Sequence, residues 1–433
     1  MSVALIIIIS IAVALILLMV GCPVFLCLGI TGGLGIFLNG GTAGLSLLQT
    51  TVFGSVSKFT LVAAPLFGSA FINNLSRGIG ADLYNAFSRL LRRLPGGLAI
   101  ATVLASAVFG AMCGVSIAAV ASIGVIALPE MLRRGYSPKL AAGSVCAPGA
   151  LAMLIPPSLP FILYGEVAGV SVAELFTAGI LPGLLLMLLM CGYIAVHEIM
   201  FKTSASTSDV PLTLKEVTGF IKRLWSPLLL ILMVLGSVYL GIATPTESAA
   251  IGVIGAYAIA VFIYRKLSFK DFILTLATSA RVTGIILVIF VGAVIFTQFL
   301  NLLRVPDFFA EFIVSINVSP LMKLILIQLM LFLLGMFVDG GSMILITTPI
   351  LLPTVHAMNW DPIWFGVLMI ANINIAVITP PVGLNLYTLA GISNDVDMET
   401  ILKGTMPYVI VEIIGLILLM AFPKISLWLP GLM

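Results

Sequence analysis

The chain has 433 residues, of which 61% are hydrophobic and only 9% are charged, and its formal net charge is +3. Soluble domains carry roughly 25% charged residues, so this composition excludes a soluble globular protein and indicates a polytopic membrane protein. No charged residue precedes Lys58. Four later runs also lack charged residues, and each can hold a span of about 20 residues or a re-entrant hairpin: 94–129, 140–165, 175–196 and 224–246.

The N-terminal part of the chain is expected to cross the membrane three times, near residues 2–20, 24–38 and 59–72. It then reaches a segment rich in basic residues, 77–93, which the positive-inside rule places in the cytoplasm. Three crossings that end inside put the N-terminus outside. Residues 82–94 place leucines and a phenylalanine on one helical face and arginines on the other. This pattern predicts an amphipathic helix at the cytoplasmic membrane interface, or else an ordinary connector.

The middle of the first half is expected to form a re-entrant hairpin. Residues 95–129 leave the cytoplasmic side and return to the basic segment 133–139. An uncharged segment that starts and ends on one side must consist of two short helices. Residues 140–165 then cross outward and 175–196 cross back. The polar segment 201–223 divides the chain in half and is expected to be a cytoplasmic linker.

The two halves of the chain resemble each other. Each carries a glycine-containing motif, then a single proline, then a double proline 18 residues further on. These are GAMCGVS (110–116), Pro138 and Pro156-Pro157 in the first half, and GMFVDGGS (335–342), Pro362 and Pro380-Pro381 in the second. The ordered series predicts an internal repeat. Each half has about five crossings and one hairpin, so the second half enters the membrane inverted, and its hairpin is expected at 321–355.

The double prolines interrupt two spans, the broken helices 140–165 and 362–390. Proline removes a backbone donor and clashes with the preceding turn. Irregular backbone at membrane depth survives only where it is buried in protein or lines a wet cavity. A broken helix presents free carbonyl groups at one end and free amides at the other, which suit a small cation and an anion, respectively. The breaks, each meeting a hairpin tip, therefore predict binding of Na⁺ together with an organic anion.

We expect two sodium sites and a substrate site in these segments. The predicted residues are Gly114, Ser116, Gly149, Met153 and Pro156 for the first sodium site, Asp339, Gly341, Ser342, Asn374 and Thr379 for the second, and Pro157, Ser158, Pro381, Gly383 and Asn385 for the substrate. Asp339 stands out because an intramembrane carboxylate marks a functional site by default. A helix cap is the alternative role for Asp339, Ser116 and Ser342, and a structural kink is the alternative for the double prolines.

Proton coupling is the alternative to sodium coupling. The only two histidines, His197 and His356, lie near span ends, which favours sodium. Glu247 also lies at a break between apolar runs. We expect it to cap the helix begun by Pro245 and Thr246, with a functional role as the alternative.

The motifs in combination resemble a known family. GAMCGVSIAAVASIGVIALPEM, RRGYSP and PPS in the first half, GIATPTESAA in the middle, and VDGGS, TPPVG and NLY in the second half are similar to the large membrane subunit of tripartite ATP-independent periplasmic (TRAP) transporters. The likeness covers almost the whole chain. It implies an elevator fold, in which a transport domain (95–200 and 320–433) moves against a scaffold (1–94 and 224–319), with 201–223 as the linker.

The resemblance also implies what the protein does and with which partners. It implies sodium-coupled import of an organic acid, such as a C4-dicarboxylate, sialic acid or a related sugar acid, with no organic cofactor and no nucleic acid. The expected partners are a periplasmic substrate-binding protein and a small four-helix membrane subunit on a separate chain. The expected location is the bacterial inner membrane.

Other classes of protein fit the sequence less well. An intramembrane aspartyl protease needs two facing aspartates and only Asp339 qualifies, and the chain lacks a phosphate-binding loop, so we expect no enzyme. A channel is less compatible with hairpins in inverted repeats, which favour alternating access. A stand-alone sodium/dicarboxylate carrier is the main alternative, and a requirement for a soluble binding protein would distinguish it.

Overall fold

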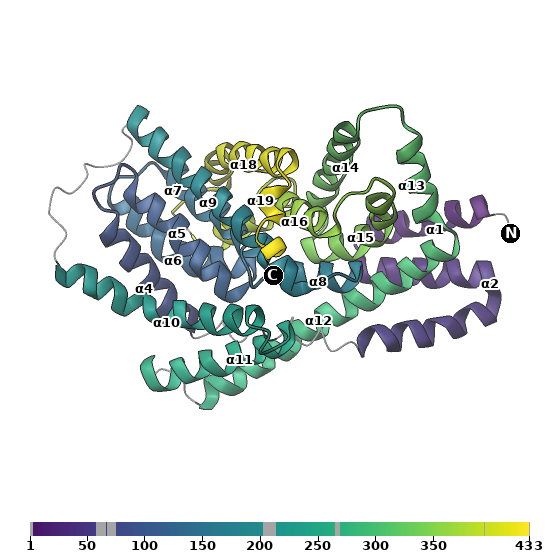
Figure 1. Cartoon of the computed structure of the whole chain (residues 1–433), viewed down its shortest axis with the longest axis horizontal. Coiled ribbons are helices and arrows are strands. Elements are labelled where there is room, and N and C mark those ends of the chain that lie inside the picture. Colours follow the sequence, from purple (N-terminus) through teal and green to yellow (C-terminus); the bar gives the residue numbers. More distant parts are fainter. Residues whose placement is uncertain are drawn as a thin grey trace.

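The computed structural model describes residues 3–57, 66, 75–201, 214–264, 269–393 and 395–432, and every regular element within them is a helix (Figure 1). Six of these helices are long and apolar enough to cross a membrane. The predicted all-α polytopic fold is therefore confirmed. In chain order the helices are α1 (Val3–Met19), α2 (Val24–Val56), α4 (Leu75–Leu90), α5 (Gly97–Cys113), α6 (Ser116–Arg133), α7 (Pro138–Ala150), α8 (Leu159–Ala168), α9 (Val172–Phe201), α10 (Leu214–Tyr239), α11 (Pro245–Ala258), α12 (Phe269–Leu302), α13 (Val305–Ser315), α14 (Pro320–Gly335), α15 (Gly340–Ala357), α16 (Pro362–Val377), α17 (Leu384–Ile392), α18 (Met398–Ala421) and α19 (Lys424–Leu427).

Two long helices, α2 and α12, pack against each other near the end of the molecule that holds the N-terminus (Figure 1). Glycine permits this close approach, because a Cβ atom on Gly32 would lie 2.8 Å from the backbone of Phe296. α2 bends at Gly41, where φ is 58°. The helical segment extends to Val56, beyond the predicted span 24–38. The predicted span 59–72 lies, apart from residue 66, outside the described residues.

Several predicted boundaries differ from those of the observed helices. The helix expected at 82–94 is α4, which begins at Leu75 and ends at Leu90, so Leu91 and Leu94 lie beyond it. Its buried residue Leu83 joins the main core, and α4 packs against α5, α6 and α10. The apolar face therefore contacts protein. In addition, α10 begins at Leu214, inside the predicted linker 201–223, of which residues 202–213 lie outside the described residues.

The cap predicted for Glu247 is confirmed. The Thr244 hydroxyl oxygen accepts a hydrogen bond from the Glu247 backbone N–H at 3.3 Å, and the Glu247 carboxylate accepts one from the Thr244 N–H at 2.8 Å. Pro245 occupies the first turn of α11, where its missing donor costs nothing. This capping box accounts for the polar residues at that break.

The first hairpin consists of α5 and α6, which extends to Arg133 rather than ending at 129. Gly114 closes its tip in the left-handed region, with φ of 64°. A Cβ atom on Gly114 would lie 2.9 Å from the Pro157 carbonyl oxygen, so glycine lets the tip approach the first helix break. That break separates α7 from α8 and contains Pro156-Pro157.

The second hairpin consists of α14 and α15, over residues 320–357 rather than 321–355. Its tip also contacts the break of its own half, because the Val382 backbone N–H donates to the Met336 carbonyl at 3.2 Å. The second break separates α16 from α17, which ends at Ile392. Both predicted hairpins and both predicted breaks are therefore present.

The halves are related by reciprocal contacts. α6 packs against α17, and its counterpart α15 packs against α8; α7 packs against α18, and its counterpart α16 packs against α9. Contacts that recur with the roles of the partners exchanged are typical of a two-fold relationship. Both hairpin tips and residues that flank both breaks consequently lie around one cavity. The inverted orientation of the second half in the membrane stays a prediction.

Candidate functional site

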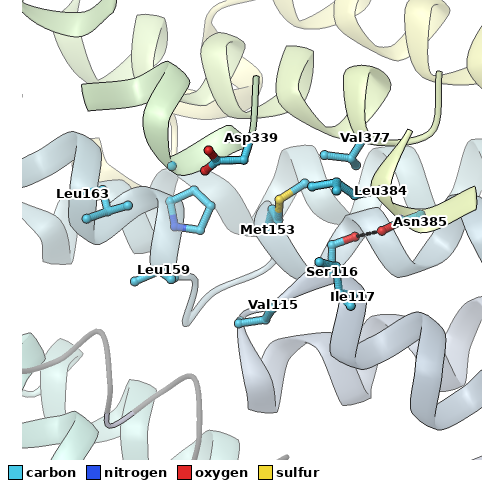
Figure 2. Close-up of a pocket in the computed structure, with 14 residues that line it drawn as sticks. Val115, Ser116, Ile117, Met153, Leu159, Leu163, Asp339, Val377, Leu384 and Asn385 are labelled. Atoms are coloured by element: carbon cyan, nitrogen blue, oxygen red, sulfur yellow. Dashed lines mark hydrogen bonds between the residues drawn. The ribbon is translucent and has the colours of Figure 1, made fainter. Parts of the chain in front are cut away.

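A cavity of about 170 Å³ lies where the two hairpin tips meet (Figure 2). It is lined by both tips, by the first break, and by the first turns of α8 and α17. The lining residues are Gly114, Val115, Ser116, Ile117, Met153, Leu159, Pro160, Leu163, Asp339, Gly340, Gly341, Val377, Leu384 and Asn385. Segments that are more than two hundred residues apart in sequence thus form one site.

Ser116, at the tip of the first hairpin, is bonded to the second half of the chain. Its hydroxyl donates to the Asn385 carboxamide oxygen at 2.7 Å (Figure 2). The Asn385 amide nitrogen donates in turn to the Cys146 carbonyl at 3.0 Å, which fixes the orientation of the carboxamide. Because the Ser116 hydroxyl uses its hydrogen on Asn385, only oxygen lone pairs remain for a ligand. The tip therefore presents an acceptor, as a cation requires.

The first break is closed by hydrogen bonds within itself. Ser158 caps α8, and its hydroxyl donates to the Met153 carbonyl at 2.5 Å. Gly149 packs against the start of α6, since a Cβ atom there would lie 2.3 Å from the Val120 side chain. Pro156 and Pro157 are buried. Of the residues predicted in this break, only Met153 lines the cavity.

The second hairpin tip contributes the only charged side chain in the cavity lining, Asp339. Asp339 is also the N-cap of α15, and its carboxylate accepts from the Ser342 backbone N–H at 3.0 Å. The Ser342 hydroxyl is buried without a hydrogen-bond partner. Asn374 is fully buried, and both polar atoms of its carboxamide also lack partners. Buried polar atoms in proteins usually have a hydrogen-bond partner, so each of these atoms could accept or donate to a water or an ion.

The second break lies beside this tip. The Thr379 hydroxyl donates to the Ile375 carbonyl at 2.6 Å and extends the end of α16. Gly383 adopts φ of 47° immediately before α17. Pro381 is exposed. These three residues hold the break in shape but do not line the cavity.

The structure therefore brings together part of the predicted set. Gly114, Ser116 and Met153 meet Asp339, Gly341 and Asn385 at one cavity. The remaining predicted residues are not part of its lining: Gly149, Pro156, Pro157, Ser158, Ser342, Asn374, Thr379, Pro381 and Gly383. The apolar lining was not predicted, above all Leu159, Pro160 and Leu384. Their position in the first helical turn after each double proline could have indicated it.

The electrostatics of the cavity suit a cation and an anion together. The Asp339 carboxylate and the Ser116 oxygen offer negative charge and lone pairs. α8 begins at Leu159 and α17 at Leu384, and both residues line the cavity. The N-terminus of a helix carries partial positive charge and free amides that attract anions. One cavity can therefore hold both kinds of ion.

The chain is similar to known transport proteins over its whole length. A family model described as "Tripartite ATP-independent periplasmic transporter, DctM component" matches residues 11–425. The C4-dicarboxylate TRAP transporter large permease protein DctM of Pseudomonas aeruginosa is 33% identical over 407 residues, which cover 93% of each chain. The sialic acid TRAP transporter large permease protein SiaM of Vibrio cholerae is 29% identical over 418 residues, which cover 96% of each chain.

Two further comparisons extend this likeness. The isethionate TRAP transporter permease protein DctMQ of Oleidesulfovibrio alaskensis is 31% identical, and the match covers 96% of this chain and 65% of that protein. The solved structure of the YdaH transporter of Alcanivorax borkumensis superposes with a TM-score of 0.65 over 88% of this chain and 89% of that chain. At 16% sequence identity, this last comparison shows a similar fold alone.

Proposed function

Since this chain belongs to the family of the DctM component of tripartite ATP-independent periplasmic transporters, we propose that it imports an organic acid anion by sodium symport. Membership makes it a large permease subunit, a multi-pass protein of the bacterial inner membrane, and not an enzyme. The family of tripartite transporters implies a substrate-binding protein and a small membrane subunit as partners. The coupling ion, the substrate class and the transport movement are the proposal.

The observation that carries the proposal is that Asp339, Ser116 and the N-termini of two broken-helix segments line the same cavity. For sodium, it offers a carboxylate and a serine oxygen with free lone pairs. Two further buried oxygens without a partner belong to Ser342, which follows the lining residue Gly341, and to Asn374, one helical turn before the lining residue Val377. Oxygen ligands are those preferred by hard cations. The sodium ions are co-transported and act as substrates, so they leave with the cargo.

For the organic anion, the cavity offers helix N-termini and a bound cation rather than basic side chains. Its lining contains no lysine or arginine. An anion without a basic partner needs positive charge from helix ends and from co-bound sodium. This arrangement supports coupling, because the anion binds well only when the cations are present. The names of the relatives described above give C4-dicarboxylates, sialic acid and isethionate as their substrates, which supports an acid as the cargo of this chain.

We propose that transport proceeds by an elevator movement of the hairpins and broken helices against the helices around α2 and α12. The two-fold arrangement of tips and breaks supports it, because a site between two related repeats can be exposed alternately to each side. A stand-alone sodium/dicarboxylate carrier, which would work without a binding protein, is the alternative.

Uptake by proteoliposomes tests the proposal. The vesicles would contain this chain and its small membrane subunit, and labelled C4-dicarboxylates, sialic acid and sugar acids would be offered with and without an inward sodium gradient. Each condition would be run with and without the periplasmic binding protein. Uptake that requires both sodium and the binding protein supports the proposal. Uptake with sodium alone would identify a stand-alone carrier, and uptake indifferent to sodium would overturn the coupling.

A further inference from the structure

The cavity proposed to bind the acid has few polar side chains. Among the described residues that line it, only Ser116, Asp339 and Asn385 carry polar side chains, and Asp339 alone is charged. In Figure 2, Met153 lies between Asp339 on one side and the hydrogen-bonded pair of Ser116 and Asn385 on the other. The other lining residues are apolar or are glycines. These side chains limit which acids the cavity can bind.

Two of the helix starts at the cavity are free to bind an anion. The helices α6, α8, α15 and α17 all begin with a residue of the lining. Ser158 caps the start of α8 and Asp339 caps that of α15, whereas α6 and α17, both in the described part of the chain, have no side-chain cap. An uncapped start offers backbone N–H groups and partial positive charge to an anion. The hydrogen bond between Ser116 and Asn385 joins these two starts, so one end of the cavity suits an anion.

The end of the cavity formed by α8 is apolar. Leu159, Pro160 and Leu163 of this helix line it, and in Figure 2 Leu159 and Leu163 lie on the side away from Asn385. Proline has no backbone N–H, and leucine side chains donate no hydrogen bond. An apolar group gains free energy by leaving water for such a place, whereas a polar group that gains no hydrogen bond there loses free energy. The part of a bound acid that lies against α8 should therefore be apolar.

The charges at the cavity balance for an acid with one carboxylate. The described lining residues include no lysine or arginine, and Asp339 supplies one negative charge. The two sodium ions expected from the sequence bring two positive charges, so one positive charge remains. A single carboxylate neutralises it. A second carboxylate would leave a buried negative charge without a partner, which is costly in an apolar site.

We propose that the cavity binds a small acid with a single carboxylate and an aliphatic body, in preference to dicarboxylates and sugar acids. The carboxylate lies at the starts of α6 and α17, and the aliphatic body lies against Leu159 and Leu163. The cavity volume of about 170 Å³ is below the roughly 300–1,000 Å³ of typical ligand sites, so the acid is small. The inference rests on the proposed function, because it takes this cavity as the site of the acid.

Matched pairs of acids test this selectivity. The complex of this chain with its small membrane subunit would be melted in lipid nanodiscs, in sodium or potassium chloride, at increasing concentrations of each acid. Butyrate is compared with succinate, which adds a second carboxylate to the same four-carbon chain. Hexanoate is compared with gluconate, which adds hydroxyl groups to the same six-carbon chain. In sodium, we expect butyrate and hexanoate to reach half of their maximal shift in melting temperature at concentrations at least about 100-fold lower than their polar counterparts.

A substitution at Ile117 tests the charge balance. Ile117 lines the cavity in the first turn of α6 and is 42% exposed, so a longer side chain fits there without disturbing the core. Ile117→Arg supplies the positive charge that the lining lacks, and it should improve succinate binding at least about tenfold. Ile117→Gln is the matched control, because it adds a polar side chain without charge and should not improve succinate binding. Elution of both variants as a single monodisperse peak checks that they fold.

The outcomes separate this inference from the proposed function. Sodium-dependent binding of succinate or gluconate as tight as that of the aliphatic partner would overturn the inference and leave sodium symport standing. Leucine binding more tightly than 4-methylpentanoate, the same chain without the ammonium group, would assign Asp339 to an amine and also overturn the inference. Equal succinate binding by Ile117→Arg and Ile117→Gln would overturn the charge balance. Selective binding that is the same in potassium would support the selectivity and overturn only the sodium coupling, and no binding of any acid would overturn both.

Discussion

The Ser116 hydroxyl donates a 2.7 Å hydrogen bond to the carboxamide of Asn385, a residue from the other half of the chain. The bond joins the tip of the first hairpin to the first turn of α17, which follows the second break. Asn385 is itself held by the Cys146 carbonyl. Residues from both halves of the repeat therefore fix the direction in which the Ser116 hydroxyl donates its hydrogen. A substitution of Asn385 should change how Ser116 presents its oxygen to the cavity.

A double-mutant cycle tests this relationship. Ser116→Ala removes a proposed sodium ligand, and Asn385→Leu removes the acceptor that orients it, so each should weaken the sodium dependence of uptake by about tenfold, the equivalent of about 1.4 kcal/mol. Because the two residues form one unit, the double variant should be hardly weaker than either single variant. The measurement is the sodium concentration that gives half-maximal uptake. Additive losses would mean that the two residues act separately.

Asp339 has two roles that one pair of variants can separate. Its carboxylate caps α15 through the Ser342 backbone N–H, and its charge lies at the cavity. Asp339→Ala removes both and should lower the free energy of unfolding by about 0.5–2 kcal/mol. Asp339→Ser retains a capping oxygen without the charge, so it should keep the thermal stability yet lower sodium-dependent uptake. The measurements are the melting temperature in detergent and uptake in proteoliposomes. Asp339→Ser with unchanged uptake would leave the aspartate as a cap alone.

Much of this architecture could be predicted from the sequence, because its signals are local. Double prolines break helices wherever they occur, and glycine motifs mark tips, so both hairpins and both breaks were predicted near their observed positions. The contact between Ser116 and Asn385 could not be predicted, because it depends on how the halves dock.

Close packing of α7 on α18 gives a stability prediction. A Cβ atom on Gly404 would lie 2.0 Å from the Lys139 carbonyl oxygen, and one on Gly143 would lie 2.1 Å from the Gly404 carbonyl oxygen. Gly404→Ala should therefore push the helices apart and destabilise the fold by about 1–3 kcal/mol. Gly192→Ala is the matched control, since no atom outside its own stretch of helix lies within 4 Å of its added Cβ and alanine favours the helix. Thermal melting in detergent measures both. Equal melting temperatures of the two variants would contradict the close packing of α7 against α18 at Gly404.

We expect the protein to lose stability in acid because Asp397 becomes protonated there. It is the N-cap of α18 and lies outside the span, and hydrogen bonds from the Thr400 side chain, then its backbone, lower the pKa of the carboxyl below the usual value. A folded-state pKa below the unfolded one means that the stabilisation is present above the usual value and is lost as the pH falls through the folded-state pKa. The Asp397→Asn variant should not show this acid-dependent loss of stability. Melting temperatures across the acid range would check it, and identical pH profiles would refute it.

We expect sodium coupling to require the second break, because a backbone hydrogen bond joins this break to the second hairpin tip. Pro380 and Pro381 follow the end of α16 at Val377, and the Val382 N–H after them donates to the Met336 carbonyl at the second tip. Replacing both prolines with alanine restores two backbone donors and removes the steric block to helix continuation. α16 should then extend toward α17, pull Val382 away from Met336, and cost at least about tenfold in sodium affinity, since more than one hydrogen bond changes. Pro407→Ala is the control, because α18 already continues through Pro407. If the double variant retained the sodium dependence of the control, the break would be a structural kink and not a cation site.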